Sequence, residues 1–205
     1  MTEEQPVPPR RRMHILQLLP NLISILALCA GLTAIRFASW IGASVVNTAL
    51  TTPVVPGQPG ASVGEPTSQG GSRTAGVEVF ARTAEVLREV GKVAADLGVD
   101  ISIEVHQQSI ADNSWATLHL LDLVGLPNVG ANPDLGNIYW TYEVPEETSE
   151  AAIVALAPRA KYWHCKNLIR VHIPENKHAI FLRVPLPDGD IDYRFAIHAM
   201  VAAGY

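Results

Sequence analysis

The stretch GVEVFARTAEVLREVGKVAADLGVDISIEVH, residues 76–106, joins a helical pattern to a strand pattern. Its first part places apolar side chains three to four residues apart, which predicts an amphipathic helix over residues 76–97. Gly98 follows, and glycine is a common residue just beyond the end of a helix. Residues 99–106 form a short run rich in β-branched side chains, which predicts a strand. The stretch therefore indicates one helix–strand unit of an α/β fold.

The same alternation continues to the end of the chain. The later sequence predicts, in order, a helix over 114–123, a strand over 128–134, a helix over 149–156, a strand over 160–167 and a helix over 192–203. An earlier apolar run, residues 41–50, predicts one more strand. Strands that alternate with helices are typical of a parallel sheet, so we expect an α/β protein.

The composition excludes some classes of protein. Hydrophobic residues make up 48% of the 205 residues and charged residues 17%, which is below the usual share of about 25%. This balance excludes a disordered chain rich in both charges. The formal net charge is −5, so there is no overall positive field and we expect no nucleic-acid partner.

The N-terminal region differs from the rest. A basic tail, residues 1–12, is followed by an uncharged run of 23 residues, Met13 to Ile35. A helix of this length spans about 35 Å, enough for a bilayer core of about 30 Å. We therefore expect a transmembrane helix over residues 13–38 at the cytoplasmic face of the inner membrane. A signal peptide and a buried soluble helix are the alternatives.

The remaining chain divides into two parts. Residues 39–75 combine the first predicted strand with a loop rich in proline and glycine. Residues 76–205 contain the regular helix–strand alternation and form the expected catalytic domain.

Three predicted strand ends carry side chains that bind metals. Glu104, Asp134 and His164 follow one another at intervals of 30 residues. Because the carboxyl ends of parallel strands meet at one edge of a sheet, we expect these side chains at matching heights. Two carboxylates and one imidazole suit a divalent cation: Mn²⁺, Mg²⁺, Co²⁺ or Zn²⁺. The alternative is that each strand end is polar only because it meets solvent.

Further polar residues accompany this trio. His106 and Lys166 each lie two positions after a candidate ligand and so face the same side of the sheet. Asn137 lies in the turn that follows Asp134. These residues are candidates for contacts around the metal, and solvated loop residues are the alternative interpretation.

The second half of the chain contains four motifs: ISIEVHQ (101–107), VGANPDLGN (129–137), YWHCKN (162–167) and PLPDGDIDYRFAIHAMVAAGY (185–205). They resemble the sugar phosphate isomerases and epimerases of the xylose isomerase-like TIM barrel superfamily. The resemblance covers about residues 42–205. It implies a partial (β/α)8 barrel of about four βα units, preceded here by the transmembrane helix.

The resemblance also implies a chemistry. A divalent cation, with Mn²⁺ as the first expectation, binds Glu104, Asp134 and His164 and stabilises an enediolate beside a carbonyl. Glu104 acts both as a ligand and as an acid/base catalyst. The implied contacts to a sugar or polyol substrate come from four residues: His106, Asn137, Lys166 and Arg170.

Two features set this chain apart from that family. The family's eighth strand supplies a further Glu as metal ligand and second acid/base, and the sequence ends at Tyr205 before such a residue. We therefore expect a C-terminally truncated barrel with impaired isomerase or epimerase activity and open sheet edges that allow self-association. Residues 18–38 resemble the first transmembrane helix of bacterial phosphatidylserine synthases, of the CDP-alcohol phosphatidyltransferase family. The alternative function is accordingly a non-catalytic, membrane-anchored fragment of that ancestry.

Overall fold

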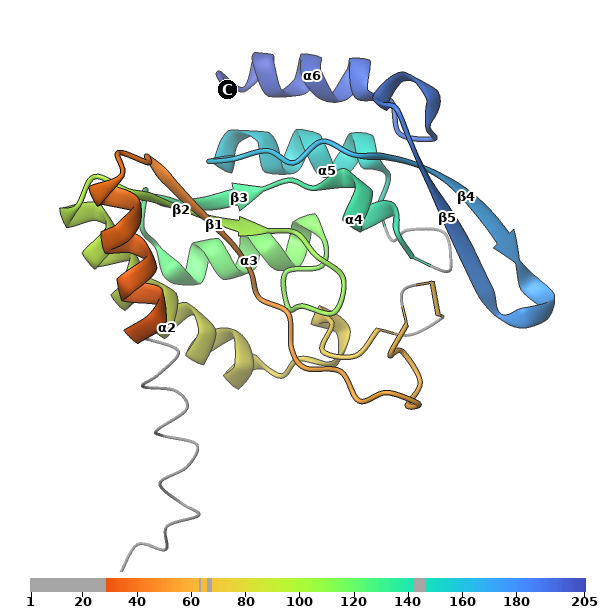
Figure 1. Ribbon diagram of the computed structural model, residues 1–205, viewed down its shortest axis with the longest axis horizontal. Helices are drawn as coiled ribbons and strands as arrows, with labels where there is room; N and C mark the ends of the chain where they lie inside the picture. Colours follow the sequence, from red (N-terminus) through yellow and green to blue (C-terminus); the bar gives the residue numbers. More distant parts are fainter. Residues whose placement is uncertain (1–28, 63, 66–67, 142–146) are drawn as a thin grey trace, which may run out of the picture.

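A computed structural model describes residues 29–62, 64–65, 68–141 and 147–205 (Figure 1). Residues 29–40 are helical and lead into the first strand. The main elements are then β1 (Val45–Ala49), α2 (Val77–Asp96), β2 (Asp100–Glu104), α3 (Ser114–Val124), β3 (Val129–Asn132), α4 (Leu135–Tyr139), α5 (Ser149–Leu156), β4 (Asn167–Ile173), β5 (His178–Val184) and α6 (Tyr193–Ala202). Single 3₁₀ turns cover Ser72–Thr74, Ala157–Arg159, Pro174–Asn176 and Leu186–Asp188.

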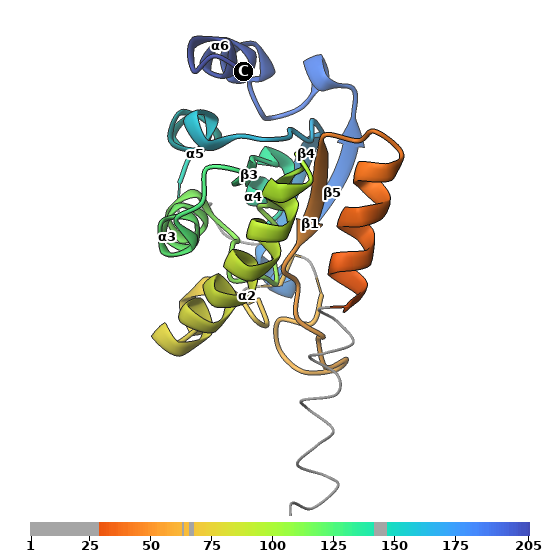
Figure 2. The ribbon, with the colours of Figure 1, turned by 90° about the vertical axis from the view of Figure 1, so that its left-hand side faces the viewer.

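The central sheet is parallel, as the sequence predicts, with the strand order β1-β2-β3. At its carboxyl edge Glu104 pairs with Ala49 on one side and with Asn132 on the other. Helices α2, α3 and α5 lie side by side along one face of the sheet (Figure 2). This arrangement is consistent with consecutive βα units of a barrel.

The core lies between the sheet and these helices. Ile101 and Ile103 of β2 are buried together with Phe80 of α2 and Leu120 of α3. Burial of one such side chain stabilises the fold by about 1.5–3 kcal/mol. Because side chains alternate along a strand, Glu104 is directed to the opposite face of the sheet. The alternation thus separates the core from the face that carries the candidate ligands.

Local signals account for several helix ends. Gly98 adopts the left-handed conformation (φ 67°) directly after α2, as predicted. Asp192 caps α6 by accepting hydrogen bonds from the backbone N–H groups of Arg194 and Phe195. At α5 the cap is Thr148, one residue before the predicted start, because its side chain accepts a hydrogen bond from the N–H of Ala151.

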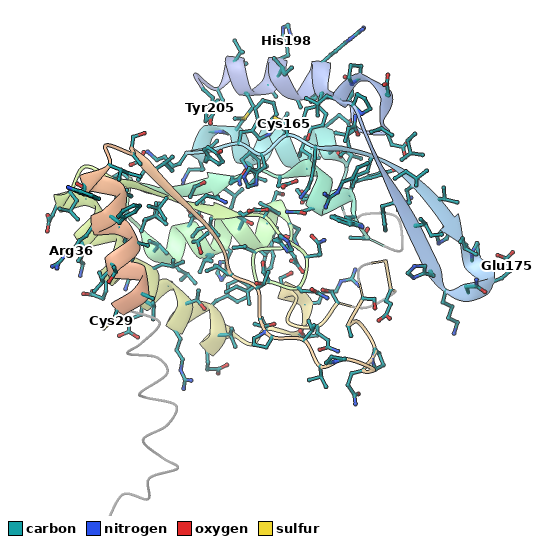
Figure 3. All side chains as sticks on the ribbon, in the orientation of Figure 1. Cys29, Arg36, Cys165, Glu175, His198 and Tyr205 are labelled. Carbon is teal, nitrogen blue, oxygen red and sulfur yellow. The ribbon has the colours of Figure 1, made fainter. Side chains whose placement is uncertain are left out.

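The predicted strand over residues 160–167 is wrong for most of its length. Only Ala160 forms a bridge to the sheet, with Ala131. Beyond it, side chains replace the ladder: the N–H of His164 donates to Oδ1 of Asn132, and the N–H of Lys166 donates to the hydroxyl of Tyr193. The chain then enters an antiparallel hairpin, β4–β5, that the sequence analysis did not predict. Glu175, labelled in Figure 3, marks the tip of this hairpin, which projects from the body.

The predicted transmembrane segment, residues 13–38, lies mostly outside the described residues. Its described part belongs to the helix over residues 29–40, where Ile35 and Ala38 are buried and Ile35 joins the main core. Within the part of the chain that the structure describes, no helix combines the length and apolar character needed to span a bilayer.

Candidate metal centre

Three side chains with metal-binding atoms meet at the carboxyl edge of the parallel sheet. Glu104 Oε2 lies 3.4 Å from Nδ1 of His164, and Asp134 Oδ2 lies 3.7 Å from the same nitrogen. One such atom from each residue lies within 4.8 Å of the other two. Atoms that share one cation at about 2.1 Å lie roughly 3–3.5 Å apart. The structure therefore brings together the three predicted ligands at a spacing that a single divalent cation would bridge.

Each of the three comes from a different kind of local structure. Glu104 is the last residue of β2. Asp134 lies two residues beyond the end of β3 and caps α4, because its Oδ1 accepts a hydrogen bond from the N–H of Asn137. His164 lies in the irregular segment after the bridge at Ala160, on either side of which no regular ladder forms; Cys165 marks this segment in Figure 3.

The predicted matching heights are therefore wrong in detail. In the sheet Glu104 pairs with Asn132, not with Asp134. Asp134 reaches the site only because the chain turns into α4 after β3 ends. The equal spacing of 30 residues identified the right side chains without describing their register.

Asp134 is the most deeply buried of the three, with a side chain that is 0% exposed. Burial raises the pKa of Asp134 above its ordinary value, although the ammonium group of Lys166 acts in the opposite direction. Lys166 Nζ lies 2.9 Å from Oδ2, but this contact does not meet hydrogen-bond geometry, and Oδ2 has no hydrogen-bond partner. A buried carboxylate oxygen without a hydrogen bond is costly. A cation bound beside Oδ2 would offset that cost.

Glu104 has the opposite electrostatic balance. Burial acts to raise its pKa, but hydrogen bonds from Asn47 and Asn137 and the nearby charge of His164 outweigh burial, so the pKa of Glu104 lies below its ordinary value. Asn47 Nδ2 donates to Oε2 at 3.0 Å, and Asn137 Nδ2 donates to Oε1 at 3.0 Å. Glu104 is consequently a carboxylate at neutral pH, as both metal binding and proton abstraction require.

Two of the predicted substrate contacts adjoin the three ligands. Asn137 bridges the site, because it donates to Glu104 and also to the carbonyl of Val105 at 2.9 Å. Lys166 Nζ donates to Asn137 Oδ1 at 2.7 Å and lies beside Asp134. Both residues therefore border the space in front of the candidate ligands.

The other two predicted contacts point elsewhere. Nδ1 of His106 lies 2.6 Å from the carbonyl oxygen of Gln107. The Arg170 guanidinium lies over the ring of Tyr139, 5.2 Å from its centroid, and its backbone N–H donates to Asp190. The structure does not place either side chain against Glu104, Asp134 or His164.

Sequence reasoning missed two asparagines at the site. Asn47 of β1 and Asn132 of β3 both face the ligands, and Asn132 is fully buried. A signal was present, since each is a polar residue inside an otherwise apolar strand. A buried amide needs hydrogen-bond partners, so such residues mark places where a strand contacts other polar groups.

The chemistry of the donor set fits a divalent cation. Two carboxylate oxygens and one imidazole nitrogen are suitable ligands for Mg²⁺, Mn²⁺, Co²⁺ or Zn²⁺. A protonated His164 held between two carboxylates is the alternative without a metal. That arrangement leaves Asp134 Oδ2 without a hydrogen bond, whereas a cation at the centre would be bonded to it.

Comparisons with known proteins agree on one family. The sequence profile described as xylose isomerase-like TIM barrel matches residues 30–205, and the match begins inside the predicted membrane segment. A search of curated proteins found no match.

Solved structures share the fold. The chain is 23% identical to a xylose isomerase-like TIM barrel protein from Mycobacterium smegmatis in complex with magnesium, with a TM-score of 0.74 over 87% of this chain and 57% of that chain. It is 19% identical to a D-allulose 3-epimerase from Methylomonas sp. (TM-score 0.59, 85% of this chain, 51% of that one). It is 15% identical to a mannonate dehydratase from Streptococcus suis serotype 2 (TM-score 0.62, 87% and 59%). The chain thus spans a little over half the length of each of these structures.

Proposed function

The chain belongs to the xylose isomerase-like TIM barrel family, and on that premise we propose that it is a metal-dependent enzyme that moves a proton at the carbon beside the carbonyl of a small sugar. Such a transfer is the first step of isomerisation or epimerisation. The observation that carries the proposal is the convergence of Glu104, Asp134 and His164 on one point, with Asp134 Oδ2 lacking any hydrogen bond. Epimerase and dehydratase structures with this fold support it.

The residues at the site have distinct roles in this proposal. A bound divalent cation supplies Lewis-acid polarisation of the substrate carbonyl. Glu104 takes the proton from the neighbouring carbon, and hydrogen bonds from Asn47 and Asn137 hold its carboxylate in place. Lys166 Nζ, on a side chain that is 28% exposed, donates to a substrate hydroxyl. His164 is the most exposed of the three ligands and marks the open side from which the substrate enters.

Solvent exchange tests the proposal. We expect the protein loaded with Mn²⁺ to incorporate deuterium from D₂O at the carbon beside the carbonyl of ketopentoses or ketohexoses, because Glu104 returns a solvent-derived hydrogen to that carbon. Nuclear magnetic resonance of the recovered sugar measures the exchange, and EDTA should stop it. Exchange that continues at the same rate in EDTA, or no exchange with any of these sugars, would contradict the proposal.

The N-terminal segment is the subject of a separate proposal. We propose that residues 13–38 attach the chain to the cytoplasmic face of the inner membrane, on the grounds of the uncharged run that follows Arg10, Arg11 and Arg12. The attachment would lie N-terminal to Ile35, because Ile35 is packed in the core.

Alkaline carbonate extraction of expressing cells tests membrane attachment, and we expect the full-length chain in the pellet. A variant lacking residues 1–28 should become extractable, since it loses most of the uncharged run. Recovery of the full-length chain in the carbonate supernatant would rule the attachment out. Attachment without any hydrogen exchange would instead favour the alternative, a non-catalytic fragment of phosphatidylserine synthase ancestry.

A further inference from the structure

Asn132 connects two of the candidate ligands through its side chain. It is the last residue of β3, it pairs with Glu104 across the sheet, and its side chain is fully buried. Its Oδ1 accepts a hydrogen bond of 2.7 Å from the backbone N–H of His164. Its Nδ2 donates to Oδ1 of Asn47 at 3.1 Å.

Asn47 continues the connection to the catalytic carboxylate. Its Nδ2 donates to Oε2 of Glu104 at 3.0 Å, and this is the same oxygen that lies 3.4 Å from His164 Nδ1. A chain of three hydrogen bonds therefore runs from the His164 backbone through Asn132 and Asn47 to Glu104. The chain begins and ends on candidate ligands.

Each amide in this chain has a fixed orientation. If the Asn132 amide turned over, its NH₂ group would face the N–H of His164, and its oxygen would face the oxygen of Asn47. Only a side chain with one donor and one acceptor on the same planar group satisfies both neighbours. Aspartate keeps the acceptor but loses the donor, and alanine loses both.

The segment that carries His164 has few other constraints from the sheet. Only Ala160 bridges to β3, and the N–H of Lys161 donates to the carbonyl of Ala131. The hydrogen bond to Asn132 is thus what replaces the strand ladder at the position of the ligand itself. The position of the His164 backbone depends on a side chain of the neighbouring strand.

We propose that Asn132, acting with Asn47, is a positioning residue that fixes the distance between the His164 imidazole and the Glu104 carboxylate and so prepares the metal site. This inference rests on the proposed function, since it assumes that these side chains bind a divalent cation. Outer partners of metal ligands typically change metal affinity by about 10–100-fold when removed. The effect of losing Asn132 should fall in that range.

Asn128 provides a matched control. It precedes β3 at the opposite end of the strand, and its side chain also bonds to the main chain, donating to the carbonyls of Gly91 and Val99 at 2.9 and 3.4 Å. Asn128→Ala removes the same amide far from the ligands, so it reports the purely structural cost of such a change.

The test is the dissociation constant for Mn²⁺ alone, measured by titration calorimetry on the full chain. We expect Asn132→Ala to weaken Mn²⁺ binding by about 10–100-fold and Asn128→Ala to change it by less than about twofold. Asn132→Asp should remain impaired, because it keeps the bond to His164 but cannot donate to Asn47. Thermal unfolding of all variants shows whether stability alone tracks the loss of affinity.

Two results would overturn the inference. One is Mn²⁺ binding by Asn132→Ala that equals wild type; the other is an equal loss in Asn128→Ala. If Asn132→Ala fails to fold, Asn47→Ala, at a half-buried position, decides the question through the same measurement, and unchanged affinity there would refute the relay. A wild-type protein that binds no Mn²⁺ would instead refute the proposed function.

Discussion

Replacing Glu104 by glutamine is expected to slow metal-dependent hydrogen exchange by about 10²–10⁴-fold, the usual contribution of a general base. The carboxylate lies within 3.4 Å of His164 Nδ1 and is held by two asparagine donors. Glutamine has nearly the same shape but cannot take up a proton from carbon. Its NH₂ group would also face one of the two asparagine NH₂ groups. The rate of deuterium incorporation into a ketose measures the effect.

Glu89→Gln is the control for this change. Glu89 lies on the exposed side of α2 and pairs only with Lys92 among the described residues, so the same chemical change there should leave exchange unaltered. Exchange by Glu104→Gln at the wild-type rate would show that another group moves the proton.

The largest effect on metal binding is expected from Asp134→Asn. The change removes the only negative charge that is fully buried at the site, while the amide oxygen still caps α4 by accepting from the N–H of Asn137. Because a coordinating carboxylate is lost rather than an outer partner, Mn²⁺ affinity should fall by more than about 100-fold. Equilibrium dialysis against Mn²⁺ measures the loss.

Asp122→Asn serves as the comparison for that experiment. Asp122 pairs with Arg159 on the surface at 2.8 Å, so its loss removes one carboxylate far from the ligands. If Asp134→Asn and Asp122→Asn retained equal amounts of Mn²⁺, Asp134 would not be a ligand.

The amphipathic helices could be predicted because periodicity is a local property. The pattern from Val77 to Asp96 and the glycine at 98 locate α2 almost to the residue. The three candidate ligands were also accessible, since each follows a recognisable apolar run. What connects them was not: Asn132 and Asn47 are 85 residues apart in sequence, and their polarity alone does not reveal the partner.

The β4–β5 hairpin could have been inferred more fully from sequence. Residues 167–184 contain two stretches rich in β-branched and apolar side chains on either side of Pro174-Glu175-Asn176, which forms the turn. The segment around His164 was harder, because its hydrogen bonds go to side chains of Asn132 and Tyr193 rather than to a neighbouring strand. Such contacts depend on tertiary structure and leave no periodic pattern.

One measurement tests the central claim most directly: the anomalous difference map of a crystal of the full chain soaked in Mn²⁺. The account predicts a single strong peak bonded to Glu104, Asp134 and His164, at roughly 2.0–2.3 Å from one atom of each, and no such peak in Asp134→Asn. A soaked crystal in which His164 remains between the two carboxylates, with Mn²⁺ absent or bound elsewhere, would contradict it.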